Sequence, residues 1–179
     1  MNLPLASVFA CALVSALPGD PPRSTNSLEF ADGGKVEVSY NQINLGGGIT
    51  LQNLMARSEI GTRVRQIFNE RAFMGRIAGR LTVATSTEIA GNALEPGAYQ
   101  LSFRIDEQLA WSLVVLTPGG EEVFAAPLDT RRSDAGSAKR LVIRPSATDN
   151  KKGAGQLEIR FGELSASAGF TAAAAGERK

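Results

Sequence analysis

Apolar and polar residues alternate over much of the chain, which is typical of β-strands with one buried face. The clearest example is Ala98–Ile105, where every second residue from Tyr99 onward is apolar or aromatic. We expect that face to lie in the core and the opposite face, which carries Ser102, to be solvated. Two turn signals precede this strand. Gly91-Asn92 is a pair that tolerates positive φ, and Pro96-Gly97 combines a fixed φ with a glycine free to be left-handed.

Similar patterns, separated by turns that contain Gly, Pro or Asp, predict further strands on both sides of this one. They cover residues 35–40, 81–84, 87–89, 111–116, 122–126, 141–143 and 157–161. Pro145 is expected to stop the strand at 141–143, and residues 131–139 are expected to form a polar loop. Short strands at roughly 8–12-residue spacing predict an all-β fold, namely an antiparallel β-sandwich with a barrel-like alternative.

One segment has a different period and predicts a short helix inserted around residues 58–75. Ser58 is a suitable N-cap, and Gly75 can end the helix. Its apolar residues follow approximate helical spacing at Ile60, Val64, Ile67, Phe68 and Met74. The same region holds the densest basic cluster, formed by Arg57, Arg63, Arg65, Arg71, Arg76 and Arg80. We interpret the cluster as a solvated face on which the aliphatic parts of the arginine side chains cover apolar neighbours. Binding of an anion by these arginines is the open alternative.

The two ends of the chain differ from the middle in composition. Residues 1–16 resemble a signal peptide, with a short apolar run followed by Val14-Ser15-Ala16, which predicts a periplasmic or secreted protein. Cys11 offers an alternative, in which the processed protein is lipid-anchored through that residue. Proline-rich residues 17–30 are expected to be a linker, residues 31–166 a single β-sandwich domain and residues 167–179 a disordered tail.

The residue inventory excludes several kinds of site. The chain of 179 residues has no histidine and one cysteine, with 19 basic and 18 acidic residues. A Ser-His-Asp triad, a Cys-His pair and the usual zinc sites are therefore ruled out. Balanced charge disfavours nucleic acid as a partner. We expect no metal or other cofactor, and no stable membrane insertion after the signal peptide is cleaved.

Two catalytic arrangements remain possible from the residues alone. Ser137 and Lys139 are close enough in sequence for a Ser-Lys dyad, although they lie in a polar segment. Four acidic residues flank the expected central hairpin and could serve as paired carboxylates: Glu88, Glu95, Asp106 and Glu107. Gly46-Gly47-Gly48 lacks the lysine of a phosphate-binding loop, and Asp149-Asn150 lacks the further oxygen ligands of a calcium loop.

Three segments together resemble the bacterial uncharacterised domain family DUF 2911: Lys35–Tyr40, Glu88–Leu101 and Trp111–Val115. The late strand Leu157–Phe161 fits the same order. The resemblance implies an exported β-sandwich protein of unknown activity. Residues 72–80 lack the Trp-Arg-Thr-Gly-Ala-Asn segment that members usually carry there, which indicates a divergent member.

Two hypotheses of different classes follow from these observations. The first is a non-catalytic exported binding or structural β-sandwich module that presents loops to an unknown protein or glycan. The second is a hydrolase that uses carboxylates or a Ser-Lys pair. Acidic side chains that converge in a concave pocket would favour the hydrolase, and exposed carboxylates scattered over turns would count against it.

Overall fold

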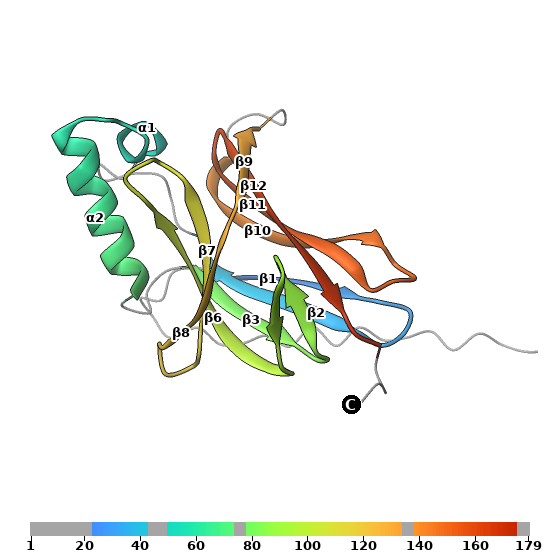
Figure 1. The fold of residues 1–179 in the computed structure, drawn as a ribbon. Coiled ribbons are helices and arrows are strands. Elements are labelled where there is room, and N and C mark those ends of the chain that lie inside the picture. The colour runs from blue at the N-terminus through green and yellow to red at the C-terminus, as the bar shows by residue number, and fades with distance from the viewer. Residues whose placement is uncertain (1–22, 43–49, 74–77, 134–137, 175–179) are drawn as a thin grey trace, which may run out of the picture.

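The computed structural model describes residues 23–42, 50–73, 78–133 and 138–174 of the chain. These residues form two antiparallel β-sheets that pack against each other, with two helices to one side (Figure 1). The predicted all-β sandwich is therefore confirmed, and the sheets do not close into the barrel-like alternative.

The first sheet has the strand order β1-β2-β3-β6-β7-β8. Its strands are β1 (Arg23–Glu29), β2 (Lys35–Asn41), β3 (Gly79–Val83), β6 (Gly97–Ile105), β7 (Trp111–Leu116) and β8 (Glu122–Pro127). The second sheet has the order β10-β11-β12-β4-β5, and β9 pairs with the part of β12 that β4 leaves open. Its strands are β4 (Thr87–Ile89), β5 (Asn92–Leu94), β9 (Asp129–Arg132), β10 (Ala138–Asp149), β11 (Ala154–Gly162) and β12 (Leu164–Ala172).

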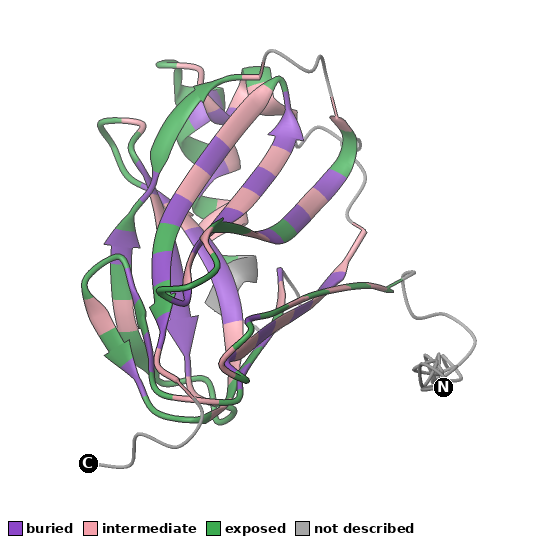
Figure 2. Ribbon diagram, turned by 90° about the vertical axis from the view of Figure 1, so that its right-hand side faces the viewer, coloured by how far each residue is buried: buried purple, intermediate pink, exposed green. Residues whose placement is uncertain are grey.

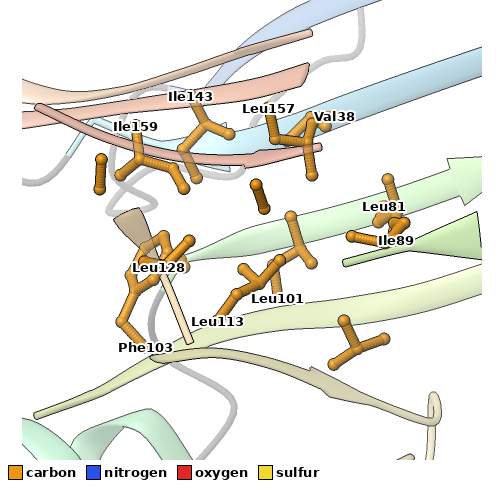
Figure 3. Packing of buried hydrophobic residues seen from close by; sticks show 14 of the residues in the cluster. Val38, Leu81, Ile89, Leu101, Phe103, Leu113, Leu128, Ile143, Leu157 and Ile159 are labelled. Atoms are coloured by element: carbon orange, nitrogen blue, oxygen red, sulfur yellow. The ribbon is translucent and has the colours of Figure 1, made fainter. Parts of the chain in front are cut away.

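The core lies between the two sheets and is filled by the inward residues of each strand. Buried and more exposed positions alternate along the strands, as Figure 2 shows. In the close-up view, Leu101 and Phe103 of β6 lie on the opposite side of the core from Leu157 and Ile159 of β11 (Figure 3). Phe103 is 2% exposed, so the predicted inward face of the central strand is confirmed at this position.

The two sheets are connected to each other along both sides of the sandwich. On one side the chain passes from β8 directly into β9, so a single segment leaves the first sheet and enters the second. On the other side β1 lies against β10, and Nδ2 of Asn26 donates a hydrogen bond of 2.7 Å to the carbonyl oxygen of Ile143. This bond satisfies a backbone acceptor on the open edge of β10.

The helix predicted over residues 58–75 is present as α2 (Glu59–Phe73), and Ser58 caps its start by accepting from the Gly61 backbone N–H. A one-turn helix that the pattern did not predict, α1 (Leu51–Leu54), precedes it. Together the helices close part of the core through Trp111, which packs edge-on against Phe68 and donates to the Met55 sulfur. Ile60 does not share this buried face. It is 69% exposed, because it lies in the first turn of α2, outside the contact with the sheets.

The expected linker over residues 17–30 is wrong from Arg23 onward, because β1 pairs with β2 along its whole length. Its sequence is polar, so its pattern alone gives little sign of a strand. The expected disordered tail from residue 167 is also wrong, since β12 continues to Ala172. Its buried residues include Ala166, Ala168 and Ala172, whose small side chains carry the period-two pattern only weakly.

Pro145 does not end a strand, contrary to expectation. It lies inside β10 opposite Leu157, and β10 is the outermost strand of the second sheet. Proline is tolerated there because an edge strand has one side on which no backbone donor is needed. The polar segment 131–139 is not simply a loop, since its start belongs to β9 and its end to β10.

Three expectations for the central hairpin also need correction. The tight turn between β4 and β5 places Ala90 and Gly91 at positive φ, so the special pair is shifted by one residue from Gly91-Asn92. Gly97 is not left-handed and instead begins β6 opposite Val83. Ser102 is 2% exposed, so the outer face of β6 is not solvated at this position.

Candidate functional site

A shallow hollow of about 240 Å³ lies on the outer face of the first sheet, where β3, β6 and the turn after β7 meet. Its lining residues are Arg80, Ala98, Tyr99, Gln100 and Pro118. The β3–β6 register places Arg80 directly opposite Gln100, although the two residues are far apart along the chain. Strand pairing alone therefore brings a guanidinium and an amide side by side.

Gln100 is held in place within this hollow. Its Nε2 donates a hydrogen bond of 2.9 Å to the carbonyl oxygen of Pro118, which follows β7. The bond leaves the amide oxygen as a hydrogen-bond acceptor. A fixed amide loses less side-chain entropy when a ligand binds than a free one does.

Arg80 supplies the charge of the hollow. Its side chain is exposed, and none of the ion pairs found among the described residues involves it. A guanidinium presents five N–H donors in a planar fork that matches a carboxylate or a pair of hydroxyls. Tyr99 lines the hollow as the residue between Ala98 and Gln100, and its ring lies on the core side of β6, where its hydroxyl donates to the carbonyl oxygen of Glu95 at 2.8 Å.

The lining of the hollow suits binding and lacks the groups that bond-breaking chemistry needs. It contains no carboxylate, serine, threonine or lysine side chain. Arginine stays protonated, so Arg80 is unsuited to general acid or base catalysis at neutral pH. What the lining side chains offer is hydrogen-bond donors and one amide acceptor.

The four candidate carboxylates are not brought together. Glu88, Glu95, Asp106 and Glu107 are all exposed. Glu95 precedes β6 and Asp106 follows it, and a nine-residue strand spans about 30 Å. Glycoside hydrolysis needs two carboxyl groups about 5–9.5 Å apart. Asp106 also has a structural partner, because its carboxylate accepts from the Ala110 N–H at 2.8 Å.

The other predicted candidates contribute no site among the described residues. Ser137 and Gly46–Gly48 lie outside the described residues, and Lys139 is an exposed residue of β10. The Asp149 carboxylate accepts from the Lys151 N–H and lies 3.8 Å from the Lys152 amine, as is usual for a turn. Within the described ranges, no three acidic side chains gather in a way that would hold a metal ion.

The basic cluster separates into side chains with different surroundings. Arg65 is 7% exposed and donates to the carbonyl oxygens of Leu54 and Ala56, at 3.0 and 2.7 Å. It therefore ties α2 to the carbonyl end of α1 and is a structural residue. Arg57 and Arg63 are exposed, and the side chains of Arg71 and Arg76 lie outside the described part of the chain. Arg80 is the one member that lines the hollow.

Sequence analysis missed Gln100, Tyr99 and Pro118 as companions of Arg80. No local signal marks them, because their proximity comes from strand register and from the turn after β7. Comparisons with family models, curated proteins and solved structures find no match to this chain. Among the described residues, no helix has both the length and the apolar character needed to cross a membrane.

Proposed function

We propose that this protein is an exported, non-catalytic β-sandwich module that binds a glycan or a protein through the hollow at Arg80 and Gln100. The observation that carries the proposal is the combination in one hollow of an arginine without an ion pair among the described residues and an amide fixed by a hydrogen bond. The hydrolase alternative has no comparable support, because the four candidate carboxylates are exposed and none of them lines the hollow.

The size and charge of the hollow indicate the kind of ligand. Pockets for drug-sized molecules are roughly 300–1,000 Å³, so a hollow of about 240 Å³ suits one sugar ring or one protein side chain. The guanidinium favours a ligand that carries a carboxylate. An acidic sugar of a polysaccharide or an exposed Asp or Glu of a partner protein meets both requirements.

The proposal is tested by binding measurements with acidic oligosaccharides. Oligogalacturonate and oligoglucuronate are titrated into the protein by calorimetry, and backbone NMR shifts locate the contact. Arg80→Ala should abolish the heat of binding, because it removes the charge that pairs with the ligand. Arg131→Ala is the matched control, since Arg131 is an exposed arginine of β9 in the other sheet.

Equal weakening by Arg80→Ala and Arg131→Ala would indicate diffuse attraction between opposite charges and would contradict a site at the hollow. Shift changes confined to the second sheet would contradict it as well. If neither sugar binds, a pull-down with the Arg80→Ala protein as its control tests the protein-ligand form of the proposal. Loss of a specific partner from that variant alone would support it.

Export and family membership belong to the same proposal. The apolar run and Val14-Ser15-Ala16 support cleavage after residue 16, so the protein recovered from the periplasm or medium should begin at Leu17. An acylated Cys11 would support the lipid-anchored form instead, and a retained Met1 would contradict both. Membership in DUF 2911 is supported by Glu88–Leu101, which forms β4, β5 and the first part of β6. A solved family member with a different strand order would contradict it.

A further inference from the structure

From the geometry of β1 we infer that this strand pairs with β1 of a second copy of the chain and joins two sandwiches through a continuous sheet. β1 is the outermost strand of the first sheet, and within the described residues it pairs with β2 alone (Figure 1). An edge strand presents a row of backbone donors and acceptors that another strand can use.

The hydrogen-bonding pattern shows which residues of β1 face outward. The Phe30 N–H donates to the Gly34 carbonyl oxygen at 2.8 Å, so this pair is a hydrogen-bonded one in the β1–β2 ladder. Hydrogen-bonded and non-hydrogen-bonded pairs alternate along an antiparallel ladder. The backbone groups of Arg23, Thr25, Ser27 and Glu29 therefore point away from β2.

The backbone hydrogen bonds of β2 agree with this assignment of outward-facing residues on β1. The Lys35 carbonyl oxygen, opposite Glu29, accepts from the Ala84 N–H at 3.0 Å. The Asn41 N–H, opposite Arg23, donates to the Ala78 carbonyl oxygen at 3.1 Å. Both groups turn toward β3, so their partners on β1 are left facing the open edge.

The sequence of β1 is complementary to itself in an antiparallel arrangement. If Asn26 lies opposite Asn26 of the second copy, Thr25 lies opposite Ser27 and Arg23 lies opposite Glu29. This register pairs outward-facing residues with one another, as an antiparallel ladder requires. Arg23 and Glu29 are exposed, and neither takes part in an ion pair found among the described residues.

Several features favour a second copy over a different partner. The arrangement is isologous, so it closes at two chains and does not propagate into a fibre. Each opposite-charge pair occurs twice, and Thr–Ser pairs across strands also stabilise a ladder. Asn26 already fixes β1 against β10 through the Ile143 carbonyl oxygen, so the strand is held in place before a partner arrives.

The experiment is analytical ultracentrifugation of the purified protein over a range of concentrations. A single added strand buries less than a standard interface, so we expect a reversible monomer–dimer equilibrium that weakens as salt is raised. Arg23→Glu should weaken dimerisation by about tenfold, because two attractive pairs become two repulsive ones. Glu29→Arg should have the same effect. The double variant Arg23→Glu/Glu29→Arg should restore dimerisation, because the pairs are re-formed with reversed signs.

A backbone test complements the charge reversal. Ser27→Pro removes an outward N–H without removing a bond to β2 and should leave the protein monomeric, whereas Ser27→Ala keeps that N–H and should still dimerise. Circular dichroism confirms that each variant remains folded. A monomer at every concentration would overturn the proposal. A dimer that all these variants leave unchanged would also overturn it, because the contact would then lie on another surface.

Discussion

The side-chain amide of Asn69 takes the place of a neighbouring strand for the backbone of Ile105. Nδ2 of Asn69 donates to the Ile105 carbonyl oxygen at 2.9 Å, and the Ile105 N–H donates to Oδ1 of Asn69 at 3.0 Å. β3 stops pairing with β6 at Leu101, so the last residues of β6 would otherwise have an open edge on this side. The helix α2 therefore completes the first sheet as well as covering part of the core.

Asn69→Ala should destabilise the protein by about 2 kcal/mol, because it removes two hydrogen bonds and leaves backbone groups without partners. Gln66→Ala, an exposed position of the same helix, is the control and should change the free energy of unfolding by less than about 0.5 kcal/mol. Urea unfolding followed by circular dichroism measures both. Equal effects would indicate that the helix matters only through its intrinsic stability.

The two faces of β6 should respond differently to truncation. Phe103→Ala should cost about 3–5 kcal/mol, because it opens a cavity in the core. Ser102 is as buried as Phe103, but its hydroxyl has no hydrogen-bond partner among the residues that the structure describes. Ser102→Ala should therefore be neutral or stabilising by up to about 1 kcal/mol, since it removes a buried polar group that is not satisfied. A loss on Ser102→Ala would mean that the hydroxyl makes a bond in solution. Denaturant titration decides between these outcomes.

Two glycines of the central hairpin provide a matched test of backbone conformation. Gly91 has a φ of 81°, and a Cβ there would meet no atom of the described ranges within 4 Å. Gly91→Ala should cost about 1 kcal/mol or more through backbone strain alone. Gly97 is not left-handed, and its added Cβ would lie 3.7 Å from the Tyr99 ring, an ordinary contact. Gly97→Ala should change stability by less than about 0.5 kcal/mol. Thermal unfolding of both variants should rank them in this order.

Alanine substitutions of Arg65 and Arg63 should distinguish a structural arginine of the basic cluster from one that only adds surface charge. Arg65→Ala should destabilise by about 3 kcal/mol, because it leaves the Leu54 and Ala56 carbonyl oxygens without their buried donor. Arg63→Ala removes an exposed side chain and should have little effect. Chemical unfolding curves provide the comparison. If Arg65→Ala proved neutral, α1 would not depend on this contact.

Strands with large apolar residues were predictable because period-two alternation is a local property of the chain. β2, β6, β7 and β11 were expected at nearly their observed positions, and α2 was expected from helical spacing and the Ser58 cap. In each of these elements, the spacing of apolar residues that marks the buried face can be read from a few neighbouring positions. The absence of histidine likewise excluded several catalytic sites without any knowledge of the fold.

The tertiary structure alone decided which weakly patterned segments became strands. β1 is polar, the buried residues of β12 are mostly alanines, and β10 contains Pro145, so their own sequences do not favour them as strands. Each exists because a neighbouring strand supplies partners for its backbone groups. Pro145 is tolerated because β10 is the outermost strand of its sheet, and no local pattern reveals which strand is outermost.

The candidate site also depended on the tertiary structure. Arg80 stands in a visible basic cluster, but its meeting with Gln100 follows from the β3–β6 register, and the meeting of Asn69 with Ile105 follows from where β3 ends. The sequence by itself determined the spacing of apolar residues in each segment and the side-chain types that are present. Both are properties of residues that are adjacent along the chain. Register, edges and the neighbours of each side chain arise only when distant strands pair, so only the folded chain decided them.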